Sequence, residues 1–159
     1  MSSIESLIQG SQKLTAVFGY WPDFHDAEIL EAHFSRGDSP VFRERQPTLT
    51  AKLHTWQMTE KVDARGYYAL SHHTLVTLRF YNIEDLVMEG FNQQNVISEL
   101  KVELQERSDG PSPFFAVRFW ACHGMGAIFR CMRIEVVEAV PCTKDGSCMS
   151  GTALLGSKS

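Results

Sequence analysis

One stretch near the N-terminus decides how the fold begins: residues 18–28 read Phe18-Gly19-Tyr20-Trp21-Pro22-Asp23-Phe24-His25-Asp26-Ala27-Glu28. It holds four aromatic rings, one proline, one histidine and three carboxylates in eleven positions. Pro22 favours an extended backbone at Trp21, so a helix is expected to end before it. Aromatic and acidic side chains crowded in this way are typical of a buried corner that organises a fold, of a binding site, or of both.

The residues before this corner are predicted to form a short amphipathic helix over residues 4–18. Gly10 lowers the helix propensity in its middle, so the helix is expected to be short or split. Apolar side chains recur at helical spacing, at Leu7, Ile8, Leu14, Val17 and Phe18.

After the corner, apolar and polar residues alternate with a period of two. This pattern predicts strands near residues 26–34, 49–54, 75–81, 87–88, 100–105, 114–122 and 127–140. Parallel strands need crossovers of a dozen or more residues, and the connections here are shorter, so the sheet should be largely antiparallel. The sequence therefore predicts a mostly β fold, α+β at most. A short N-terminal helix precedes about seven strands in a curved sheet, a sandwich or a half-barrel.

Length and composition set further limits. A chain of 159 residues is enough for one domain, which we place at residues 1–141. Residues 142–159 are rich in Gly, Ser, Thr and Lys and are expected to be a disordered tail. The net charge of −4 argues against a nucleic-acid partner and is compatible with a basic protein partner.

The targeting and cysteine patterns point to the cytoplasm. The N-terminus lacks the apolar core of a signal peptide, and no apolar run is long enough to span a membrane. The spacing of Cys122, Cys131, Cys142 and Cys148 fits no zinc pattern, and reduced thiols are expected. No metal or cofactor is predicted.

The corner supplies the first candidate site: Trp21, His25, Asp26 and Glu28. If the strand begins near Asp26, then Asp26 and Glu28 share one face of it. Two carboxylates there could form a metal pair, an acid/base pair or an anchor for a partner. They could instead be structural, with Asp26 accepting backbone N–H bonds and Glu28 at the solvent edge.

Catalytic signatures are absent from the sequence. It contains no G-x-S-x-G, no H-E-x-x-H and no glycine-rich phosphate loop before a helix. Cys122 and His123 are adjacent in a predicted strand, so their side chains point apart and do not form a nucleophile and base. His72 and His73 likewise face opposite ways, so at most one of them can join any given site.

A second candidate group lies in a polar loop, at Phe91, Asn92 and Asn95. Asn residues stabilise turns through their own backbone, so the loop could be structural, with Phe91 as a core plug, or it could bind a partner. Trp56 shares the less apolar face of its strand with Lys52 and His54. An exposed Trp there would be a candidate contact for a protein partner.

Residues 18–29 resemble the opening signature of the immunity protein 50 family. The runs at residues 75–80 and 90–95 are also similar to the family, and the match in order and spacing spans residues 14–140. The resemblance implies a mostly β, non-enzymatic protein of bacterial polymorphic toxin systems that binds and neutralises a toxin domain. It implies no catalytic residues. The family-like positions are Trp21, His25, Asp26, Glu28, Phe91, Asn92 and Asn95.

The leading hypothesis is therefore a cytoplasmic toxin-neutralising protein, with a cognate toxin domain as its partner and no nucleic-acid or membrane partner. One alternative is a small metal-dependent or acid/base enzyme that uses His25, Asp26 and Glu28. Another is a structural domain that forms a homo-oligomer.

Overall fold

The computed structural model describes residues 3–62, 68–108, 110 and 113–146. In these residues eight strands form one sheet in the order β4-β7-β6-β5-β1-β2-β3-β8, with antiparallel neighbours throughout. The prediction of a mostly β, largely antiparallel fold is confirmed. The strands are β1 (Glu28–Ser35), β2 (Thr48–Val62), β3 (Tyr68–Tyr81), β4 (Glu84–Glu89), β5 (Val96–Gln105), β6 (Phe114–His123), β7 (Gly126–Cys131) and β8 (Arg133–Pro141).

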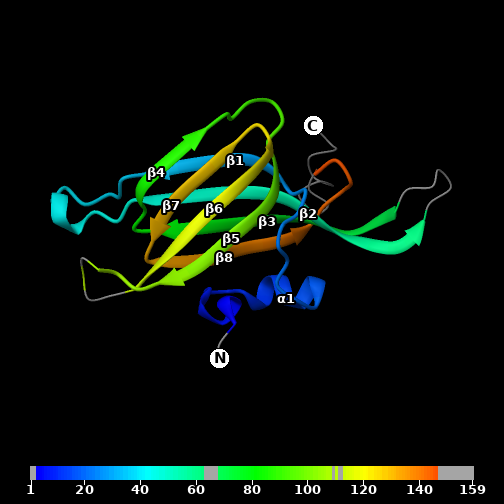
Figure 1. The fold of residues 1–159 in the computed structure, drawn as a ribbon, viewed down its shortest axis with the longest axis horizontal. Coiled ribbons are helices and arrows are strands. Elements are labelled where there is room, and N and C mark those ends of the chain that lie inside the picture. The colour runs from blue at the N-terminus through cyan, green and yellow to red at the C-terminus, as the bar shows by residue number, and fades with distance from the viewer. Residues whose placement is uncertain (1–2, 63–67, 109, 111–112, 147–159) are drawn as a thin grey trace, which may run out of the picture.

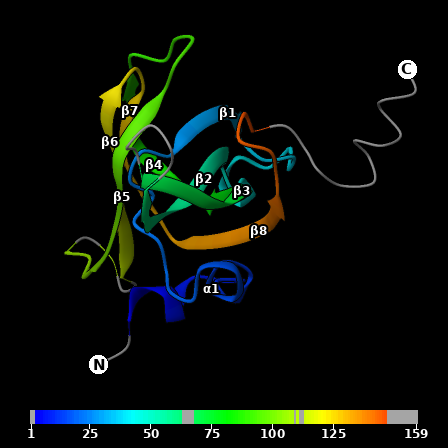
Figure 2. The same cartoon turned by 90° about the vertical axis from the view of Figure 1, so that its right-hand side faces the viewer.

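The sheet bends at the seam between β1 and β5, where the described strands share the single registered pair Glu28 and Val96. In Figure 2, β5 and β6 run upright while β8 runs across the view, so the two halves of the sheet lie at a steep angle to each other. The two halves close on a common core. Phe80 of β3 packs edge-on against Phe119 of β6 and Phe129 of β7, with ring centroids 5.9 and 5.0 Å away.

The N-terminal segment is split, as Gly10 led us to expect. A 3-10 helix, η1 (Ile4–Leu7), and an α-helix, α1 (Gln12–Phe18), flank an extended residue, Gln9, which bonds to β8. Gln9 N–H donates to Ile134 C=O at 2.9 Å, and Val136 N–H donates to Gln9 C=O at 2.7 Å. A Cβ on Gly10 would lie 2.6 Å from the Val136 carbonyl oxygen, so only glycine permits this approach. The segment covers part of the edge of β8, with α1 alongside (Figure 1).

The structure has one strand more than the sequence predicted, because the run at residues 127–140 changes partners in its middle. Cys131 is still in register with Phe115 of β6, whereas Arg133 is in register with Tyr81 of β3. Between them, Met132 N–H donates to Tyr81 C=O at 2.9 Å. The chain crosses here from one half of the sheet to the other, which separates β7 from β8.

Two further features extend past the predicted boundaries. The β2–β3 hairpin continues well beyond the rest of the sheet (Figure 1), so these strands are longer than the alternation at residues 49–54 and 75–81 indicated. The expected tail begins with packed residues. Cys142 is buried and its N–H donates to His73 C=O at 2.9 Å. Residues 147–159 of the expected tail lie outside the described residues.

Candidate functional site

The corner before β1 is a strained turn fixed against β5. Phe24 and Asp26 both have left-handed backbones, with φ of 63° and 65°. Asp tolerates this conformation, but a bulky residue adopts it rarely. The buried Phe24 ring packs edge-on against Trp21 with 5.8 Å between centroids, and Asp26 N–H donates to Ile97 C=O at 2.8 Å. Such strain costs roughly 1–3 kcal/mol per residue and is concentrated at sites that need a fixed geometry.

The polar side chains of the corner form one chain of contacts around His25. His25 Nδ1 lies 2.9 Å from the Ser98 carbonyl oxygen, and its Nε2 lies 3.5 Å from Asp26 Oδ2. The Ser98 carbonyl raises the pKa of His25, and the charges of Asp26 and Asp23 raise it further. The carboxylate that accepts a backbone bond is Asp23, from His25 N–H at 2.9 Å, and not Asp26 as the structural interpretation proposed.

These residues line a pocket of about 390 Å³ together with Trp56. The sequence predicted Trp56 and the corner as separate candidates, and the structure brings them together because β2 runs past the start of β1. Tyr20 and Asp23 line the same pocket and were missed as individual candidates, although both stand in the opening stretch. The full lining is Tyr20, Trp21, Pro22, Asp23, Phe24, His25, Asp26, Thr55, Trp56 and Gln57.

Glu28, the fourth predicted corner residue, does not line this pocket. It is half-buried in β1, where it pairs with His54 of β2 and Val96 of β5. The left-handed backbone at Asp26 lies before the strand, so the alternation of faces does not extend to it. Asp26 and Glu28 therefore do not act as the paired carboxylates that a shared strand face would give.

The loop at residues 91–95 is organised by two amides. The buried Asn95 Oδ1 accepts the N–H groups of Asn92 at 2.9 Å and Met125 at 3.1 Å, and its Nδ2 donates to the Asn92 carbonyl at 2.8 Å. These bonds join the β4–β5 loop to the β6–β7 turn. Phe91 is 53% exposed, so its expected role as a core plug is wrong.

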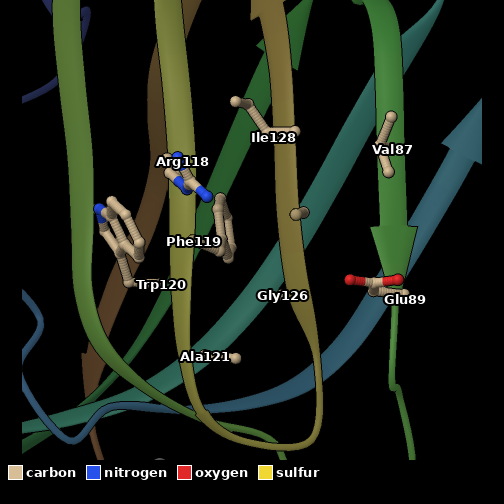
Figure 3. Close-up of a pocket in the computed structure, with 9 residues that line it drawn as sticks. Val87, Glu89, Arg118, Phe119, Trp120, Ala121, Gly126 and Ile128 are labelled. Atoms are coloured by element: carbon tan, nitrogen blue, oxygen red, sulfur yellow. The ribbon is translucent and has the colours of Figure 1, made fainter.

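A second hollow, of about 270 Å³, lies on the outer face of β4, β7 and β6 (Figure 3). The Arg118 guanidinium stacks over Trp120, 3.7 Å from the ring centroid, beside Val87 and Ile128. Gly126 supplies no side chain to fill the space between them. Sequence reasoning missed this hollow. The available signal was the two-residue spacing of Arg118 and Trp120, which places them on one strand face.

The scattered histidines are partly brought together. His54 Nε2 lies 3.0 Å from His73 Nδ1, and both rings contact Trp56. His72 instead contacts the ring of Phe18, so the expectation that His72 and His73 point apart is confirmed. Within the described part of the chain, no group of three or more His, Cys, Asp or Glu side chains could hold a metal ion. No helix among these residues is long and apolar enough to cross a membrane.

The fold and site define a mostly β protein with a rigid aromatic and acidic pocket at one end of an open, curved sheet. Residues 10–141 match the family described as immunity protein 50. Because this match covers most of the chain, the protein belongs to the immunity protein 50 family, as the sequence resemblance indicated. A comparison with curated proteins and one with solved structures each found no match.

Proposed function

We propose that this protein is a bacterial, cytoplasmic immunity protein that binds a cognate toxin domain and neutralises it without catalysing a reaction. Membership of the immunity protein 50 family is the observation that carries the proposal. The family points to a protein partner, and the corner pocket offers a preformed place for one to dock.

The composition of the pocket supports a binding role. Its lining combines exposed or half-buried aromatic rings with carboxylates, and aromatic residues are enriched among the side chains that dominate binding energy in protein interfaces. The corner backbone is fixed by bonds to β5, so little ordering is required when a partner arrives.

The test is to look for a toxin domain encoded by a neighbouring gene and to co-express it with this protein. Cells that express the toxin domain alone should stop growing, and cells that also express this protein should grow. The purified proteins should form a stoichiometric complex in light scattering after gel filtration, with no added metal or cofactor. Failure to form a complex, together with turnover of a small substrate that His25→Ala abolishes, would instead favour the acid/base enzyme.

A further inference from the structure

We propose that the corner pocket binds a cationic side chain, lysine or arginine, that a protein partner inserts between Tyr20, Trp56 and the two aspartates. This inference rests on the proposed function for the identity of the partner, which is the toxin domain. The chemistry of the pocket is argued below from this chain alone.

The aromatic wall of the pocket is available to a cation. Tyr20 is 51% exposed, and Trp21 and Trp56 are half-buried beside it. The faces of Trp and Tyr rings attract ammonium and guanidinium groups. The same kind of contact occurs elsewhere in the chain. The Arg118 guanidinium carbon lies 3.7 Å from the centroid of the Trp120 ring, and that of Arg133 lies 3.6 Å from the centroid of the Tyr81 ring. In the described residues no Lys or Arg stacks over the rings of the corner pocket.

Among the described residues, the carboxylates of the pocket have no lysine or arginine partner. Several acids are paired with a basic side chain, for example Glu84 with Arg107 and Asp85 with Arg130, each at 2.6 Å. No lysine or arginine lines the corner pocket. Among the described residues, the side-chain ionic partner of Asp26 is His25 at 3.5 Å. A second cation is therefore the chemistry that would complete this site.

His25 does not fill this role. Its Nδ1 faces the Ser98 carbonyl and its side chain is 61% exposed, so the ring lies at the rim of the pocket. Even when it is protonated, His25 supplies one positive charge beside two aspartates, Asp23 and Asp26. An arginine or lysine entering from a partner could lie against the aromatic wall and place its charge beside Asp26.

The size and rigidity of the pocket fit one inserted side chain. Its volume of about 390 Å³ lies near the lower end of the roughly 300–1,000 Å³ range typical of ligand pockets. The left-handed residues Phe24 and Asp26 hold the wall and the carboxylate in place. The outer-face hollow makes a poorer cation site, because Arg118 already covers Trp120 there.

The first experiment needs no toxin. The protein is titrated with blocked tripeptides, Gly-Arg-Gly and Gly-Lys-Gly, with Gly-citrulline-Gly as the uncharged match. The indole N–H resonances of Trp21 and Trp56 are followed by NMR. The charged peptides should shift both resonances, and the citrulline peptide should not. Asp26→Asn should weaken this binding several-fold while keeping a residue that tolerates a positive φ. Equal shifts from all three peptides, or none from the charged ones, would overturn the proposal.

The second experiment uses the neighbouring toxin domain and calorimetry. Trp56→Leu and Asp26→Asn should each raise the Kd by about tenfold or more. Trp56→Phe keeps an aromatic ring and should bind nearly as tightly as the unmodified protein. The matched controls are Trp120→Leu on the outer face and Glu103→Gln on β5, which should leave the Kd unchanged. Dispersed NMR spectra confirm that each variant folds.

The outcomes separate this inference from the proposed function. If the toxin domain binds the Trp56 and Asp26 variants as tightly as the unmodified protein, the pocket inference fails and the immunity function stands. If the charged peptides bind but the toxin domain does not, the pocket binds a cation that a partner other than the toxin domain supplies, and the proposed function fails.

Discussion

Nε2 of His54 lies 3.0 Å from Nδ1 of His73, and the two imidazoles therefore share a single hydrogen bond behind the pocket wall. Such a bond needs one nitrogen with a hydrogen and one without, so it is lost when both rings are protonated. Trp56 packs against both rings, with centroids 5.0 and 5.9 Å away. The protonation state of this pair thus bears on the packing of a residue that lines the pocket.

Burial lowers the pKa of both histidines below the ordinary value of 6.5. The charge of His73 lowers the pKa of His54 further, and Lys144 does the same for His73. Between these lowered values and 6.5, the unfolded chain binds more protons than the folded one. The contribution of this pair to the free energy of unfolding should therefore be complete above pH 6.5 and be lost as the pH drops below it. Urea denaturation at several values between about pH 7.5 and pH 5 measures this.

The His54→Gln variant should flatten this pH profile, whatever it does to stability at neutral pH. His25 provides a control of opposite sign, because its pKa is raised and its contribution is lost as the pH increases through the folded value. His25→Gln should thus remove a loss of stability between pH 6.5 and the raised folded pKa, and leave the slope below pH 6.5 unchanged. An unchanged profile in His54→Gln would show that another group controls the acid sensitivity.

The corner shows which structural features can be predicted from neighbouring residues and which cannot. Pro22 and the change in periodicity near Asp26 predicted the end of the helix and the start of the sheet, because both depend on neighbouring residues. The pocket was not predictable in this way. It requires Glu28 to pair with His54, so that β2 carries Trp56 past the corner. That register depends on residues more than twenty positions apart.

The same limit explains the other differences. Asn95 was identified as a turn residue, but its bond to Met125 depends on a contact across the fold. Residues 127–140 were predicted as one strand, although the buried positions shift from odd numbers (Ala127, Phe129, Cys131) to even numbers (Ile134, Val136) where the chain switches partners. Met132 bonds to Tyr81 there only because β3 lies in the other half of the sheet.

Asn95→Ala should reduce the free energy of unfolding by about 2–4 kcal/mol, because the change removes the acceptor for two backbone N–H groups. One of them belongs to the buried Met125 and cannot be solvated without opening the turn. Asn92→Ala is the control, since Asn92 Oδ1 accepts one exposed bond from Gln94 N–H, and it should cost less than about 1 kcal/mol. Chemical denaturation gives both values. Similar small losses in the two variants would mean that the buried amide does not organise this loop.

Gly124→Ala should be far more damaging than Gly19→Ala, although both glycines have a positive φ, 72° and 83°. At Gly124 a Cβ would clash with the Gln94 carbonyl and lie 2.6 Å from Asn95 Oδ1, whereas at Gly19 nothing lies within 4 Å. Gly19→Ala should cost about 1 kcal/mol from backbone strain alone. Gly124→Ala should cost several times more, or prevent folding. Thermal melts followed by circular dichroism compare them, and equal Tm values would contradict the close approach of these two loops.

Two truncations locate the end of the folded unit. Removal of residues 142–159 deletes the buried Cys142 and its bond to His73, and it uncovers His54, since a Cβ on Gly146 would lie 3.3 Å from His54 Nδ1. This should cost about 2 kcal/mol and lower the Tm by roughly 4–8 °C. Removal of residues 147–159 keeps all these contacts, and the Tm should change by less than about 2 °C.

The pKa of His54 provides a second measurement on the same two proteins. Burial lowers this pKa, so uncovering the ring should move it back toward 6.5 in the shorter protein. The protein that ends at Gly146 should keep the lowered value, as followed by NMR of the imidazole resonances. If both truncated proteins melt and titrate like the full chain, the turn at residues 142–146 does not contribute to the fold, and the folded unit ends at Pro141.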